Sequence, residues 1–218
     1  MYFSSRMQAG RMLAAKMLPK YRYENCAIVA LDDGGVVVGA QIAMQLHCIL
    51  TFLQTKEITL PREPNAIAGI TGGGNFVFNK DYSEGEVDEM VGEFRSYLEE
   101  ERFTKTHEVN QAIGKGELIN LKSLKHMNVI LVSDGLSNPM KLDLAEEYLK
   151  PIEIDSLIVA IPVASVPVID RVHVMADAVY CLSVIDDYFD TDHYYEKKDI
   201  PDHAKITKTI KSIVLNWK

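Results

Sequence analysis

The chain has 218 residues, a length that suits one domain, or one domain with a small subdomain. Hydrophobic residues make up 47% of it and charged residues 25%, which are ordinary values for a globular protein that can bury a core. Its formal net charge of −8 argues against non-specific binding to nucleic acid or to an anionic membrane surface.

The cysteines and the N-terminal residues indicate a compartment. Three scattered cysteines, an odd number, are typical of buried thiols in a reducing environment, and no pair has the close spacing of a zinc site. Arg6, Arg11 and Lys16 interrupt every apolar stretch near the start, so no signal peptide is expected there. No segment approaches the about 20 apolar residues of a membrane span. The sequence therefore predicts a cytoplasmic protein without a membrane partner.

The first elements are typical of a parallel α/β unit. Apolar residues at helical spacing predict a helix over 4–18 that ends at Pro19. A short apolar strand, 26–31, follows and leads into the polar turn 32–35. After the turn, residues 36–46 predict an apolar, alanine-rich helix. A strand, a glycine turn and a helix in this order open a parallel sheet.

The next segments predict smaller elements. Residues 49–60 alternate well enough for one strand. Residues 66–78 place three consecutive glycines, Gly72 to Gly74, between two apolar runs, so either a hairpin turn or a mobile loop is expected. Residues 84–103 are rich in charge but keep one apolar face, which predicts a partly exposed helix.

The strongest local pattern lies at 128–150. A buried strand, a polar turn and a helix succeed one another, with Asn138 as a good N-cap and Pro139 favoured at the first helical position. Further strands are predicted at 156–163 and 178–184, with a short helical segment between them. The whole pattern predicts a doubly wound sheet with helices on both faces.

The last helix, 203–217, carries a continuous apolar stripe that would otherwise be exposed. We therefore expect it to be docked, either on the sheet within the chain or against a second subunit. The stripe comprises Ile206, Ile210, Ile213, Val214 and Trp217.

Read together, the segments resemble the type I phosphoribosyltransferases, especially their short bacterial stand-alone members. The family's F-x-x-R-x-x-A-G helix matches Phe3, Arg6, Ala9 and Gly10, and its P-R-G-G loop matches Leu31–Gly35. Its P-x-x-E-x-A-I-G-A segment resembles Pro61–Gly69. Its V-I-L-V-D-D-G-I-A-T-G-A-T signature lines up with Val129–Lys141, and its A-V-P-V-A strand matches Ala160–Ala164. The resemblance implies one domain over 1–218, with a central, mainly parallel sheet, helices on both faces and a small hairpin or hood.

The resemblance also implies which residues would face a phosphoribosyl diphosphate donor. The family's paired acids hold the ribose hydroxyls; they match Ser133 and Asp134 here. The turn that follows these acids cradles the 5′-phosphate. The P-R-G-G loop after the first strand faces the diphosphate. The matching phosphate residues are Gly135, Ser137, Asn138 and Lys141, and the matching diphosphate loop is Asp32, Asp33, Gly34 and Gly35.

All three loops depart from the family pattern. Ser133 lacks the charge of a carboxylate, and Pro139 has no N–H to offer a phosphate. Asp32 and Asp33 would repel a diphosphate unless Mg²⁺, with Asp33 as a ligand, lay between them. The structural alternative is that Asp32 to Gly35 form a simple polar turn.

Two other groups have weaker interpretations. The acidic segment 190–199 could hold a metal ion, but a solvated loop is the more common structure for such residues. Tyrosines could stack a base, although core or interface tyrosines are commoner. They are Tyr21, Tyr23, Tyr194 and Tyr195.

Two functions remain open from the sequence. One is a phosphoribosyltransferase-like protein that has lost transferase catalysis and acts in binding, regulation or as a scaffold, with a nucleotide or sugar phosphate as a possible ligand. The alternative is an active phosphoribosyltransferase that uses a nitrogenous base and Mg²⁺, or a related nucleotide or sugar-phosphate enzyme. In it, Asp134 would hold the ribose, Ser137 and Asn138 the 5′-phosphate, and Asp33 the metal. The helix at 84–103 suggests a homodimer.

Overall fold

The computed structural model describes residues 2–61, 63, 65–72, 74–113 and 121–215. They form two compact units. The larger unit comprises Met1–Leu53, Ile119–Pro139 and Pro151–Lys218, and the smaller unit comprises Gln54–Leu118 and Met140–Lys150. Arg62, Pro64, Gly73 and Trp217, which belong to the sequence patterns above, lie outside the described residues.

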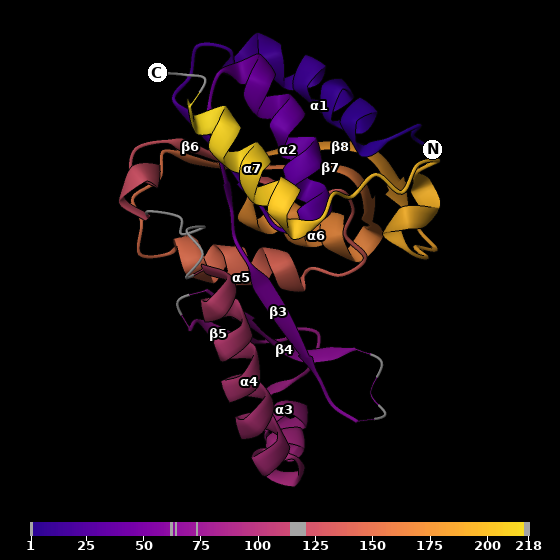
Figure 1. Ribbon diagram of the computed structural model, residues 1–218. Helices are drawn as coiled ribbons and strands as arrows, with labels where there is room; N and C mark the ends of the chain where they lie inside the picture. The colour runs from indigo at the N-terminus through magenta and orange to yellow at the C-terminus, as the bar shows by residue number, and fades with distance from the viewer. Residues whose placement is uncertain (1, 62, 64, 73, 114–120, 216–218) are drawn as a thin grey trace. The chain divides into compact units, whose positions relative to one another are not determined.

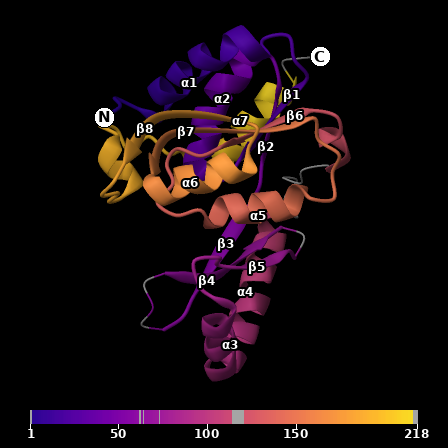
Figure 2. The same cartoon turned by 180° about the vertical axis from the view of Figure 1, so that it is seen from behind.

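The larger unit is built on a five-stranded sheet in the order β2-β1-β6-β7-β8, with every pair parallel. Helices α1, α2 and α7 cover one face and α6 covers the other (Figures 1 and 2). This confirms the predicted fold class. Its elements are α1 (Arg6–Tyr21), β1 (Cys26–Ala30), α2 (Asp33–Leu46), β2 (Ile49–Phe52), β6 (Asn128–Val132), β7 (Ser156–Ser165), α6 (Val166–Met175), β8 (Ala178–Ile185) and α7 (His203–Leu215), with short 3₁₀ turns at Leu121–Leu124 and Thr191–Tyr194.

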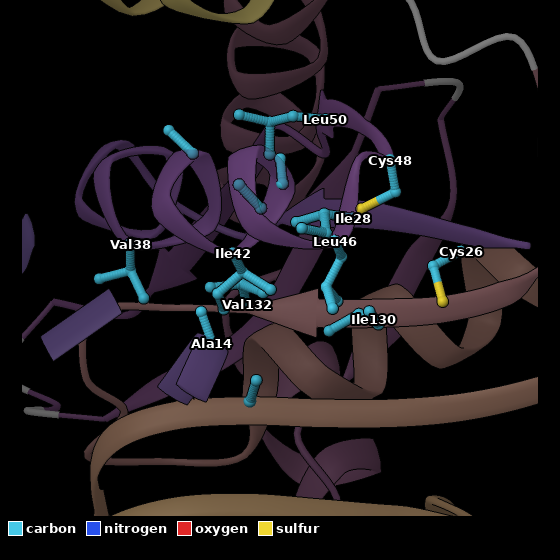
Figure 3. Close-up of a cluster of buried hydrophobic side chains, with 14 of the residues drawn as sticks. Ala14, Cys26, Ile28, Val38, Ile42, Leu46, Cys48, Leu50, Ile130 and Val132 are labelled. Carbon is cyan, nitrogen blue, oxygen red and sulfur yellow. The ribbon is translucent and has the colours of Figure 1, made fainter. Parts of the chain in front are cut away.

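The core of this unit lies between the sheet and the layer of α1, α2 and α7. Ile28 and Ile130 from neighbouring strands meet Ile42 of α2 with no exposed surface (Figure 3). β1, β6 and β7 carry almost unbroken apolar runs because helices cover both faces of the sheet. This explains why these strands were predictable from the sequence.

Helix α1 differs from its prediction at both ends. It continues through Pro19 to Tyr21, because a proline in the last turn removes only one helical hydrogen bond. Met7, one of the apolar residues whose spacing predicts this helix, is exposed, whereas Arg6 is fully buried. The buried face of α1 is therefore rotated toward the arginine.

The single strand predicted at 49–60 is two strands. β2 pairs with β1 in the parallel sheet, whereas β3 (Thr55–Thr59) belongs to the smaller unit. The chain passes from one unit to the other between Leu53 and Gln54. Alternation continues across this point because both strands have the same two-residue period.

The smaller unit contains an antiparallel sheet in the order β3-β4-β5. β4 (Ala66–Thr71) and β5 (Phe76–Phe78) form the predicted hairpin, and Gly74 in its turn has a φ of 85°. Helix α4 packs on one face of this sheet beside Ile70, and α5 packs on the other, where Leu144 lies against Gly69. The helices are α3 (Glu84–Glu93), α4 (Arg95–Ile113) and α5 (Met140–Leu149).

The helix predicted over 84–103 is also divided. α3 ends at Glu93, because the φ of −108° and ψ of 24° of its C-cap Phe94 leave the helical range, and α4 then runs from Arg95 to Ile113. Val91 and Leu98, on either side of the break, pack in one cluster against the sheet. One apolar spacing therefore spanned two helices.

The C-terminal helix is docked within the chain. Ile206 and Ile213 are buried in the core beside α2 and β2, and Ile210 packs against them. This confirms the prediction for the part of the stripe that the structure describes, which excludes the side chain of Val214.

All three cysteines are free thiols. Burial raises the pKa of Cys26 to about 11 and that of Cys48 to about 12, so both remain protonated at neutral pH. Among the residues described, no helix is long and apolar enough to cross a bilayer.

Candidate functional site

A buried arginine is the centre of the candidate site. The Nε of Arg6 donates to Asp134 Oδ2 at 2.6 Å, Nη2 donates to Asp192, and Nη1 lies 3.4 Å from Asp199 Oδ1. The guanidinium also lies 4.5 Å from the centre of the Tyr195 ring. One arginine therefore joins the end of β6 to the segment after β8.

Arg6 is placed by the start of its helix. Ser5 is the N-cap of α1 and accepts a hydrogen bond from the Gln8 N–H at 3.1 Å. Two residues before the cap, the Phe3 N–H donates to the Tyr194 carbonyl and the Phe3 carbonyl accepts from the Glu196 N–H. These contacts fix the first turn of α1 against the acidic segment 190–199. The Arg6 side chain is therefore held beside its carboxylate partners.

Aromatic residues close the site. The Tyr195 hydroxyl donates to the backbone carbonyl of Asp134 at 2.6 Å. A Cβ on Gly135 would lie 2.4 Å from the Tyr188 hydroxyl, so the loop after β6 is in contact with this ring. Tyr194 and Tyr195 are both buried, which confirms the structural interpretation of these tyrosines as core residues.

A second contact joins the β1 and β6 loops. The Ser133 hydroxyl lies 2.6 Å from Asp32 Oδ2, and the other oxygen of Asp32 accepts from the Gly35 N–H at 2.6 Å. Asp32 is the N-cap of α2, which begins at Asp33. The predicted polar turn, Asp32 to Gly35, is therefore the start of helix α2, and the Asp32 carboxylate caps it.

The two glycines of this loop are needed by the protein's own packing. A Cβ on Gly34 would lie 2.0 Å from Asp134 Oδ2, and a Cβ on Gly35 would lie 2.6 Å from the Val132 carbonyl oxygen. The space that glycine provides at both positions is thus occupied by residues of β6 and its loop.

We expect Gly34→Ala to destabilise the protein by roughly 1–3 kcal/mol, because the new methyl group must displace the Asp134 carboxylate from its ion pair. The matched control is Gly92→Ala in α3, where a Cβ would meet nothing within 4 Å. That substitution should be neutral or stabilising by up to about 1 kcal/mol, since alanine is the better helix former. Urea unfolding measures both, and equal effects would contradict the assigned contact.

The electrostatics reflect burial. Burial and the neighbouring Asp32 raise the pKa of Asp134 to about 7, although Arg6 acts in the opposite direction. Burial alone would lower the pKa of Arg6, but Asp134 and Asp192 raise it, so the guanidinium stays charged. Burial likewise raises the pKa of the Tyr195 hydroxyl, which therefore stays a hydrogen-bond donor.

The loop after β6 uses several of its polar groups internally. The Gly135 N–H donates to Ser133 Oγ at 3.2 Å, and the Leu136 N–H donates to the Val163 carbonyl at 3.1 Å. The Ser165 hydroxyl donates to the Ser137 carbonyl at 2.8 Å. These bonds bind the loop to the sheet.

The end of this loop differs slightly from its prediction. Helix α5 begins at Met140, so Pro139 directly precedes the helix rather than occupying its first position. Ser137 and Asn138 lie in the loop of the larger unit, whereas Lys141 lies in α5 of the smaller unit.

The structure brings together six of the residues predicted from the sequence: Asp32, Gly34, Gly35, Ser133, Asp134 and Gly135. Asp33, the candidate magnesium ligand, lies half-buried in the first turn of α2. The part played by Arg6 and its partners Asp192 and Asp199 was not predicted from the sequence. One signal was present, since Arg6 stands at helical spacing from Ala9, Leu13 and Met17 on the buried face of α1.

The carboxylates do not fit a metal ion as they stand. Asp134 binds Arg6, and Asp32 binds Ser133 and the Gly35 amide, so a magnesium ion would have to displace these partners. In the acidic segment, Asp192 and Asp199 bind the guanidinium. Within the described ranges, no three potential metal ligands form a cluster.

Comparisons with known proteins bear on the fold. No family model matches the sequence. The structure is similar to that of TT1426 from Thermus thermophilus, with 24% sequence identity and a TM-score of 0.70 over 100% of this chain and 99% of that one. It is also similar to a hypoxanthine phosphoribosyltransferase from Staphylococcus aureus, with 13% identity and a TM-score of 0.50 over 87% of this chain and 79% of the other. At these identities the similarity is one of fold.

Proposed function

We propose that this chain, which has the fold of the type I phosphoribosyltransferases, has lost transferase catalysis and acts by binding, as a regulatory or scaffold protein. One observation carries the proposal. The Asp134 carboxylate, the acid left in the signature, is buried, accepts from Arg6 Nε at 2.6 Å and lies against Gly34. A carboxylate that is neutralised and covered in this way is poorly suited to hold ribose hydroxyls.

The residue beside it adds to this argument. Ser133 lies within hydrogen-bond distance of Asp32 Oδ2 and of the Gly135 carbonyl, and its hydroxyl has only one proton to donate. It carries no charge that could stabilise a cationic ribose in a transition state.

The start of α2 supports the same conclusion. The N-terminus of a helix attracts anions through its free N–H groups. Here the Asp32 carboxylate already accepts from the Gly35 N–H, so the protein supplies its own anion at this point. A diphosphate would meet a negative charge where the fold otherwise offers a donor.

We expect phosphoribosyl diphosphate with Mg²⁺ to bind no more tightly than about 1 mM. Losing three contacts worth roughly 1.5–3 kcal/mol each takes a micromolar site, about −8.2 kcal/mol, to millimolar or weaker. Titration calorimetry at several millimolar donor, an amount on the order of the expected Kd, measures this.

The control for this measurement is a variant with Asp32→Pro, Asp33→Arg, Ser133→Asp and Pro139→Gly, which should gain affinity. Because Asp32 caps α2, its melting curve must be recorded to establish that it is folded. Micromolar binding by the natural protein would contradict the proposal. Diphosphate release from the donor in the presence of a purine or pyrimidine base, if Asp134→Asn abolishes it, would instead support the active enzyme.

A further inference from the structure

The smaller unit has a groove that the proposed function does not use. Its volume is about 540 Å³, within the range of about 300–1,000 Å³ found for small-molecule sites. We propose that this groove binds a flat aromatic compound that carries an anionic group and an N–H donor. β5, α3 and α4 form its walls, which carry Phe76, Phe78, Val91 and Leu98. Charged residues of the two helices lie at its rim.

Aromatic rings line one wall. Phe76 and Phe78 project from the same side of β5, and their rings lie edge to face with centres 4.9 Å apart. Phe78 keeps 37% of its surface exposed. A flat ring fits this wall because aromatic pairs prefer offset or edge-to-face contact, and it would cover apolar surface that solvent now reaches.

An arginine faces the same groove from α4. The guanidinium of Arg102 lies 4.9 Å from the centre of the Phe76 ring, and in the described part of the chain no carboxylate lies within ion-pair distance of it. A stacked guanidinium keeps its N–H donors in its own plane, where they suit a carboxylate or a phosphate. Arg102 therefore supplies the contact for an anionic group.

Other charged residues of the groove lie at its rim. Asp88 on α3 is exposed and offers an acceptor for an N–H donor. Arg95 pairs with Glu99 at 3.3 Å, but both side chains are more than two-thirds exposed, and such pairs contribute little. Arg95 and Glu99 can therefore each exchange the other for a ligand.

Gly92 provides the room. It lies in the last turn of α3, and a Cβ at this position would meet nothing within 4 Å. Among the described residues of the unit, no packing contact explains the glycine. It lines the groove, and its missing side chain leaves room there for a ligand.

The test uses adenosine monophosphate and tryptophan as probes, without Mg²⁺, in titrations of the intact protein. Both combine a flat ring, N–H donors and an anionic group, and they separate nucleotides from aromatic amino acids as the source of the ligand. We expect one of them to bind saturably and Arg102→Gln to weaken that binding at least about tenfold, or about 1.4 kcal/mol. If the nucleotide is the ligand, adenosine, which lacks the phosphate, should bind at least tenfold more weakly.

Gly92→Leu should fill the groove and abolish binding while the fold is kept, since the new side chain enters open space. Gly85→Leu is its matched control: Gly85 also lies in α3 with nothing within 4 Å of a Cβ, but it does not line the groove, so binding should be unchanged. No saturable binding of either probe up to about 10 mM, or binding that survives Gly92→Leu, would overturn the proposal.

A Gly92→Leu variant that changes from dimer to monomer in sedimentation would also overturn it, because the groove would then hold a second copy of the chain. The groove lies wholly within the smaller unit and the donor loops lie in the larger one. The two proposals can therefore fail independently.

Discussion

Arg6→Met should lower the free energy of unfolding by roughly 3–5 kcal/mol, the usual cost of removing one partner from a buried ion pair. The substitution keeps the length and apolar stem of the side chain but leaves the Asp134 carboxylate, 7% exposed, without its guanidinium. It also separates Asp192 and Asp199 from the residue that joins them. Urea unfolding at pH 8 measures the loss.

The matched control is Arg11→Met in the same helix. Arg11 is exposed, and its side chain donates to Gln41 alone among the described residues, so its replacement should change stability by no more than about 0.5 kcal/mol. Arg6→Lys keeps the charge without the fork of donors and should fall between the two.

The cost of Arg6→Met should depend on pH in a defined direction. Burial and Asp32 raise the pKa of Asp134 and Arg6 lowers it, so removing Arg6 raises this pKa further. The folded variant then binds a proton that the unfolded chain releases, and its stability falls as the pH rises above the unfolded value. The loss relative to the natural protein should therefore be smaller at pH 5 than at pH 8. A loss below about 1 kcal/mol at both pH values would show that the network contributes little.

Removing α7 by ending the chain after Asp202 should cost roughly 3–6 kcal/mol, because two fully buried isoleucine side chains contribute about 1.5–3 kcal/mol each. Ile206 and Ile213 are at most 4% exposed and cover α2 and β2. Thermal unfolding and solubility of the shortened chain measure the effect.

A full-length variant checks that the loss comes from this apolar contact. Ile206→Ser with Ile213→Ser should reproduce most of the destabilisation, whereas Lys208→Ser with Lys211→Ser, on the exposed side of the same helix, should have little effect. An unchanged melting curve for the shortened chain would contradict the docking of α7.

The sequence predicted the parallel sheet well, because strands covered on both faces are apolar throughout and end at polar turns. The prediction was wrong where one periodic pattern continued across the boundary between two elements. Residues 49–60 alternate through the passage between the two units, and 84–103 keep one apolar spacing through the bend at Phe94. Periodicity reports which face is buried and not which element buries it.

The candidate site was predictable only in part. Loops at the ends of β1 and β6 could be located, because the carboxyl ends of parallel strands meet at one edge of a sheet. The ion pair between Arg6 and Asp134 joins residues 128 positions apart, and no spacing rule relates them. The acidic residues after β8 were for the same reason interpreted as a solvated loop or a metal site instead of as partners of an arginine.

The contact between Ser133 and Asp32 limits the order in which mutations could convert this site into a donor-binding one. The two side chains are 2.6 Å apart, and Asp32 also caps α2. Ser133→Asp made first would place a buried carboxylate against that of the half-buried Asp32, at a cost to folding and with no gain in binding. Asp32 must change before it, although that step alone removes a helix cap. We therefore expect sign epistasis at this site: Ser133→Asp should harm folding before Asp32 is changed and favour donor binding afterwards. Random mutagenesis one residue at a time should rarely give the double change.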